Sequence, residues 1–126
     1  MEKIALKNYE IGYNCAQALL KTFVKELDIS EELLMKISSG LGAGMFLGET
    51  CGAVTASIIA IGIKEGGKSL EEKSKNREVF KKSKVFEQEF KNKYCSFNCK
   101  ELKTACKASC KEIVEDSAKI LKSLIV

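Results

Sequence analysis

The sequence predicts an all-α fold: a single-domain bundle of five or six helices around one buried central helix at about residues 51–65. Three observations lead to this prediction. The chain has no proline, alternation of β-branched with polar residues is scarce, and apolar residues recur at the i, i+3, i+4 spacing of a helix face. With 126 residues, 45% of them hydrophobic, residues 1–126 are expected to form one domain whose core needs no disulfide staples.

The first half of the chain contains four predicted helices, each bounded by a capping residue or by glycine. They cover residues 3–11, 15–27, 30 to about 40, and 51–65. The last of these is apolar on all sides, which is typical of a buried helix, and Gly66-Gly67 is a plausible end for it. A bilayer-spanning helix needs about 20 apolar residues, so we expect no membrane span here.

The second half contains one long and two capped helices. Residues 70–94 form an amphipathic pattern with Val79, Phe86, Phe90 and Tyr94 on one stripe, which predicts a core-facing seam; whether this helix also makes a homodimer stays open. The sequences Asn98-x-x-Glu101 and Ser109-x-x-Glu112 resemble capping boxes. They predict a short helix from Cys99 and a final helix from Cys110.

The charge pattern argues against a nucleic-acid partner. The net charge is +4, but it comes from lysines interleaved with glutamates, with Arg77 the single arginine and 7% aromatic residues. Nucleic-acid sites favour clustered basic residues with stacking rings. The start Met1-Glu2-Lys3 does not resemble a secretory signal, so we expect a cytoplasmic protein in a reducing compartment.

The cysteines are the strongest functional signal, since the chain has six of them and no histidine. Four follow a residue type that favours a helix N-cap: Asn14-Cys15, Thr50-Cys51, Asn98-Cys99 and Ser109-Cys110. The positive end of a helix dipole favours thiolate over thiol. Cys95 and Cys106 lack such a cap and form a weaker class. Without histidine, proton transfer would fall to Glu49 or Tyr13, although a dipole-stabilising role explains Glu49 better and a packing role explains Tyr13 better.

A glycine-rich stretch at residues 40–48 precedes the central helix. It follows a helix and has neither a phosphate-loop nor a dinucleotide pattern, so we expect no nucleotide site. Glycine lets backbone N–H groups converge on a negative group, and Gly42, Gly44 and Gly52 are therefore candidate cofactor-binding residues near the Cys51 thiolate. Close helix packing is the other explanation of these glycines.

At Cys51-Gly52-Ala53-Val54-Thr55-Ala56 the chain resembles the C_GCAxxG_C_C family of redox-active proteins, which carries four characteristic cysteines around a Cys-Gly-Ala-x-x-Gly motif. The resemblance extends to Gly12-Tyr13-Asn14-Cys15-Ala16, to Cys99-Lys100-Glu101-Leu102 and to Cys110. It departs from the family at Ala56, where the motif has glycine. The resemblance implies a redox role for Cys15, Cys51, Cys99 and Cys110 and names no substrate or electron partner.

The chemistry of these four cysteines stays open at this stage. Four buried thiolates need a compensating metal, protons or disulfide bonds. An iron-sulfur cluster for electron transfer is favoured slightly over dithiol-disulfide exchange, because four capped thiols exceed what a dithiol requires. A non-enzymatic structural or zinc-binding thiolate module is the alternative. The pair of C-x3-C motifs at 95–99 and 106–110 also allows a disulfide-stapled hairpin, although six residues between them are few for two helical arms.

Overall fold

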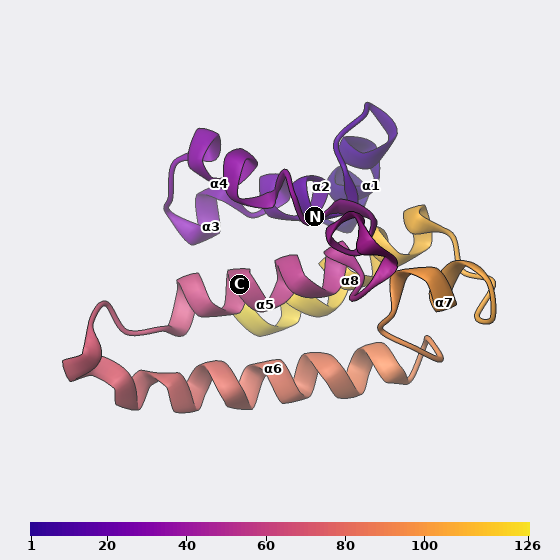
Figure 1. Cartoon of the computed structure of the whole chain (residues 1–126). Helices are drawn as coiled ribbons and strands as arrows, with labels where there is room; N and C mark the ends of the chain where they lie inside the picture. The colour runs from indigo at the N-terminus through magenta and orange to yellow at the C-terminus, as the bar shows by residue number, and fades with distance from the viewer.

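The computed structural model covers all 126 residues and confirms the all-α prediction. Eight α-helical segments are joined by one π-type turn and one 3-10 turn, and six of the helices have eight residues or more (Figure 1). In chain order the elements are α1 (Glu2–Glu10), α2 (Cys15–Thr22), α3 (Val24–Leu27), α4 (Glu31–Ser38), η1 (Gly44–Gly48), α5 (Gly52–Glu65), η2 (Leu70–Lys75), α6 (Asn76–Lys91), α7 (Cys99–Lys103) and α8 (Cys110–Ile125).

Helix α5 is the central element, as the sequence predicts. It contacts α2, α6 and α8, and in Figure 1 it runs between the group formed by α1 to α4 and the long α6. Its apolar side chains face several neighbours at once, which explains why Ala53, Ala56, Ala60 and Ile61 are all fully buried. No helix of the chain is both long enough and apolar enough to cross a membrane.

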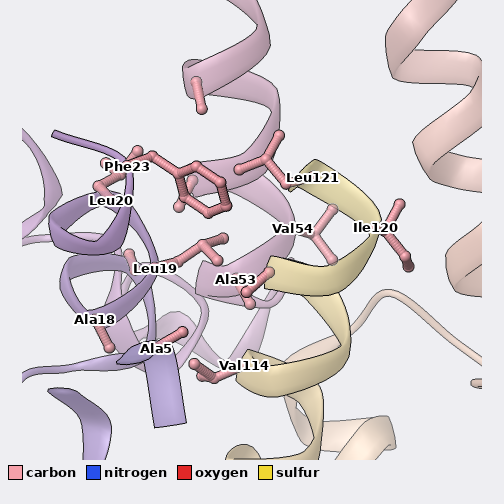
Figure 2. Packing of buried hydrophobic residues seen from close by; sticks show 14 of the residues in the cluster. Ala5, Ala18, Leu19, Leu20, Phe23, Ala53, Val54, Val114, Ile120 and Leu121 are labelled. Carbon is pink, nitrogen blue, oxygen red and sulfur yellow. The ribbon is translucent and has the colours of Figure 1, made fainter. Parts of the chain in front are cut away.

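The core is one continuous cluster of buried side chains, to which all eight α-helices contribute. Figure 2 shows Leu19, Leu20 and Phe23 extending from the α2 segment toward α5 and α8, where Ala53 and Leu121 lie. All five side chains are fully buried. Burial of a large apolar side chain contributes about 1.5–3 kcal/mol, so this three-helix contact holds α2 against the central helix.

The predicted helix over 15–27 is interrupted at Phe23, whose φ of −106° and ψ of 16° separate α2 from α3. The reason lies one turn earlier. The Ala18 carbonyl accepts a hydrogen bond from the Thr22 hydroxyl (2.8 Å) and another from the Asn8 amide (3.3 Å). Side-chain hydrogen bonds of this kind compete with the helical N–H pattern, and the sequence pattern does not reveal them.

The predicted helix over 70–94 is likewise shorter than expected. Residues 70–75 form the 3-10 turn η2, and α6 ends at Lys91. The expected seam nevertheless faces the core: Phe86 and Phe90 are fully enclosed, the Tyr94 ring packs 4.8 Å from that of Phe90, and Val79 is partly buried against the core. The Tyr94 hydroxyl donates to Asp116 on α8 at 2.5 Å, which fixes the end of α6 against the last helix.

Candidate functional site

One cavity of about 430 Å³ is lined by the four cysteines that form no disulfide bond, Cys15, Cys51, Cys99 and Cys110. Each stands at the start of a helix, and in Figure 1 both α5 and α8 begin at the end of the molecule where α7 lies. The cavity is therefore surrounded by helix N-termini, whose unpaired N–H groups favour negative charge. Cys51 and Cys99 are buried, whereas Cys15 and Cys110 are partly exposed.

A two-residue antiparallel bridge brings the Cys51 and Cys99 segments together. Thr50 pairs with Asn98, the Cys51 N–H donates to the Phe97 carbonyl at 2.8 Å, and the Cys99 N–H donates to the Glu49 carbonyl at 2.6 Å. These bonds join segments nearly fifty residues apart immediately before α5 and α7 begin. As a result, two cysteines distant in sequence face the same cavity.

Three of the four predicted helix caps are confirmed. Asn14 and Ser109 form complete capping boxes, and the Asn98 side chain accepts from the Glu101 N–H at 3.0 Å. Cys15, Cys99 and Cys110 are accordingly first residues of their helices. The prediction for Thr50 is wrong: Cys51 is itself the N-cap of α5, with φ −52° and ψ 134°, because Thr50 is held in the extended bridge to Asn98.

The segment that follows α4 forms a left-handed turn over the cavity. Four successive residues, Ala43, Gly44, Met45 and Phe46, have φ between 51° and 61°. Each non-glycine residue in this conformation costs about 1–2 kcal/mol, so the surrounding fold must hold the turn in place. The turn places Ala43 and Phe46 on the cavity wall, and the Ala43 N–H helps to lower the pKa of Cys15. The glycine-rich stretch thus interacts with the Cys15 sulfur, whereas the sequence predicted an interaction with the Cys51 sulfur.

Cys15 and Cys51 form a polarised pair of thiols. The pKa of Cys15 is lowered to about 6, first because the Cys51 thiol donates a hydrogen bond to its sulfur; burial opposes this, and the N–H groups of Ala43, Ala16 and Gly52 add to it. The pKa of Cys51 is raised, because its proton is held in the hydrogen bond to Cys15 and because its sulfur is buried. Near neutral pH, Cys15 therefore carries the negative charge and Cys51 keeps its proton.

Glycine is required where the backbone approaches this pair. A Cβ at Gly52 would lie 2.6 Å from the Cys15 sulfur and 2.6 Å from the Leu41 carbonyl oxygen, and one at Gly42 would lie 2.8 Å from the Asn14 Cβ. Gly44, with φ +61°, has no room because a Cβ would meet the Glu49 nitrogen at 2.6 Å. Gly42 lines the cavity and Gly52 is in contact with the Cys15 sulfur, whereas Gly44 shapes the turn.

Comparison with known protein families gives one match. The model described as "Putative redox-active protein (C_GCAxxG_C_C)" matches residues 13–124, nearly the whole chain. The chain belongs to this family. No curated protein and no solved structure matched it. The C_GCAxxG_C_C match includes all four cavity cysteines, and the residue that departs from the motif, Ala56, is fully buried in α5.

Besides Cys15 and Cys51, the same cavity is lined by Cys99, Cys110 and two residues that the sequence analysis missed, Tyr9 and Lys103. The pKa of Tyr9 is raised to about 12 by burial and by its hydrogen bond to Cys110. Electrostatic interaction with the Cys110 and Cys99 sulfurs raises the pKa of Lys103, while burial raises that of Cys99. The sequence could have indicated Lys103, because it follows Cys99 by four residues on one helix and therefore shares its face. No sequence pattern indicates Tyr9.

The two remaining cysteines, Cys95 and Cys106, form a disulfide with a Cα–Cα separation of 5.7 Å. Neither lines the cavity. Because α7 begins at Cys99, Cys95 and Cys99 do not lie on one continuous helix. Each C-x3-C motif therefore splits, with its first cysteine in the disulfide and its second in the cavity, and this pairing closes the loop that carries α7.

The remaining candidates of the sequence analysis take other places. Glu49 is exposed and does not line the cavity; its backbone carbonyl, not its carboxylate, takes part by accepting from Cys99. Tyr13 lines the cavity, and the Lys21 ammonium lies over its ring, 5.4 Å from the ring centroid. No three Cys, Asp or Glu side chains of the chain lie close enough together to hold a metal ion.

Proposed function

We propose that this member of the redox-active family is a thiol-disulfide exchange protein in which Cys15 attacks and Cys51 resolves. The observation that carries the proposal is the polarised pair: a partly exposed thiol with a pKa of about 6, hydrogen-bonded by a buried thiol whose pKa is raised. Thiolates are the attacking species in thiol-disulfide exchange, and an attacking thiol works best when its pKa is near the ambient pH.

The exchange balances with a disulfide substrate as the oxidant. The Cys15 thiolate attacks one sulfur of the substrate, forms a mixed disulfide and releases one substrate thiolate. Cys51 then gives its proton to that thiolate or to water and attacks the Cys15 sulfur. The products are the Cys15–Cys51 disulfide and a second substrate thiol, so two electrons pass from the protein to the substrate. A thiol or dithiol reductant would return the pair to its starting state.

The test is the pH profile of Cys15 alkylation in reduced, anaerobic protein, followed by mass spectrometry of the Cys15 peptide. We expect iodoacetamide reactivity to rise with a midpoint near pH 6 and to level off by about pH 7.5. In a separate sample that has not been alkylated, one equivalent of a small disulfide should produce a Cys15–Cys51 cross-link. Cys110→Ser is the matched control, because it removes a cavity thiol outside the pair. A midpoint near pH 9, or a cross-link from Cys15 to Cys99 or Cys110, would contradict the proposal.

A cluster-bound form is the second candidate, favoured by the presence of four thiols and several helix N-termini around one cavity. Its ligands would be Cys15, Cys51, Cys99 and Cys110, with backbone N–H groups near Gly42, Gly44 and Gly52 toward its sulfides, and it would supply one-electron transfer. Elemental analysis for iron, sulfide and zinc after anaerobic purification, with a count of free thiols, separates this form from the dithiol and from a zinc-binding or purely structural module.

A further inference from the structure

The wall of the cavity that holds the four cysteines contains one cationic side chain, Lys103. It stands one helical turn after Cys99, and electrostatic interaction with the sulfurs of Cys110, Cys99 and Cys15 raises the pKa of its ammonium. Lys103 makes none of the ten ion pairs that the structure contains. A cation at the mouth of a binding cavity, without a carboxylate partner of its own, is free to bind an anionic ligand.

A second hydrogen-bond donor lies on the same side of the cavity. Tyr9 and Lys103 line the cavity together with Cys110, and the interaction of each with the Cys110 sulfur raises its pKa, so the two groups lie beside one position. Tyr9 stays a neutral donor over the physiological range. A hydroxyl and an ammonium placed in this way match the oxygens of a carboxylate, which accepts from both.

The size of the cavity favours a small ligand. Its volume of about 430 Å³ lies within the roughly 300–1,000 Å³ of small-molecule sites. The rest of the wall is largely apolar, with Phe46, Leu102 and Ile113 among its residues. Because Cys15 is partly buried inside this cavity, a small disulfide reaches its sulfur more easily than a disulfide on a folded protein does.

From this arrangement we propose that the cavity selects low-molecular-weight disulfides that carry a carboxylate, with the carboxylate bound by Lys103 and Tyr9 and the disulfide against Cys15. This proposal rests on the thiol-disulfide exchange proposed above and names its substrate class. The exchange then proceeds by the same balanced steps, and the carboxylate-bearing thiol is released twice per turnover.

The first experiment compares an anionic with a neutral alkylating agent. The rate constants of Cys15 with iodoacetate and with iodoacetamide are measured at pH 7 and low salt in wild-type protein and in Lys103→Gln. We expect the iodoacetate-to-iodoacetamide ratio to fall about fivefold in Lys103→Gln, and this difference to shrink at 0.5 M salt. A change in the thiolate fraction of Cys15 affects both reagents equally, so it cancels in the ratio.

Lys100→Gln is the matched control, because Lys100 is exposed on the same helix and does not line the cavity. An equal fall of the ratio in both variants would mean diffuse surface charge and would overturn the proposal. An unchanged ratio in Lys103→Gln would also overturn it, while fast iodoacetamide alkylation leaves the exchange function standing. Slow alkylation of Cys15 by both reagents would instead overturn the exchange function itself.

The second experiment uses disulfides that differ in charge. Dithiodiglycolate is anionic, bis(2-hydroxyethyl) disulfide is neutral and cystamine is cationic; each is mixed with reduced protein, and release of the first thiol is timed. We expect the order anionic, neutral, cationic, and Lys103→Glu should reverse it. Tyr9→Phe should slow the anionic substrate alone, by about tenfold or more, as expected for one lost hydrogen bond to a charged group. Faster reduction of a protein disulfide such as that of insulin than of all three would overturn the proposal.

Discussion

Replacement of Gly52 by alanine isolates the contact between the α5 backbone and the Cys15 sulfur. The new Cβ would lie 2.6 Å from that sulfur and 2.6 Å from the Leu41 carbonyl oxygen, so the sulfur has to move away from the Gly52 N–H and the Cys51 thiol. Forced overpacking costs about 1–3 kcal/mol. Removal of a helical glycine offsets about 0.5–1 kcal/mol of this. We therefore expect a net loss of about 1–2 kcal/mol.

The matched control is Gly62→Ala in the same helix, because nothing lies within 4 Å of a Cβ at that position. It should stabilise the protein by about 0.5–1 kcal/mol. Thermal unfolding measures both variants, since 1 kcal/mol corresponds to about 4 °C for a chain of this length. The difference between the two variants isolates the clash from the helix propensity.

The same substitution should change the chemistry of Cys15. The hydrogen bonds that lower its pKa to about 6 are weakened when its sulfur moves, so the midpoint of its alkylation should rise. If the midpoint rises to pH 8, the thiolate fraction at pH 7 falls about tenfold, and the rate falls with it. A Gly52→Ala protein in which Cys15 still titrates near pH 6 would refute our account of why glycine follows Cys51, and Gly62→Ala should leave the midpoint unchanged.

Three further predictions follow from other contacts. In Cys51→Ala the thiol that donates to Cys15 is lost, so the alkylation midpoint of Cys15 should rise by about one to two pH units; an unchanged midpoint would assign the low pKa to the helix terminus alone. Cys95→Ser opens the disulfide-closed loop and should lower the free energy of unfolding by about 3 kcal/mol, measured by urea unfolding, without a change in that midpoint. Tyr94→Phe removes the bond to Asp116 and should cost about 1.5–3 kcal/mol in the same assay; a loss below 0.5 kcal/mol would mean that water replaces it.

The helices themselves were readable from local pattern. The absence of proline, the apolar spacing and the cap residues predicted the all-α class, the central position of α5 and three of the four caps, because a helix and its cap depend on residues within one turn of each other. Where that reading was wrong, a distant contact was responsible: Asn8 reaches the Ala18 carbonyl ahead of the break at Phe23, and the pairing with Asn98 holds Thr50 out of its expected cap position.

The sequence also pointed to the four cysteines of the cavity and, through the motif around Cys51, to the family. The sequence could not show which of these four cysteines carries the negative charge. Which sulfur carries the negative charge depends on a hydrogen bond between residues 15 and 51 and on the Ala43 N–H in a left-handed turn. The partners of Cys95 and Cys110 likewise depend on how the α7 loop closes. A thiol's pKa is set by its neighbours within a few ångströms, and in this chain those neighbours come from segments that only the folded structure brings together.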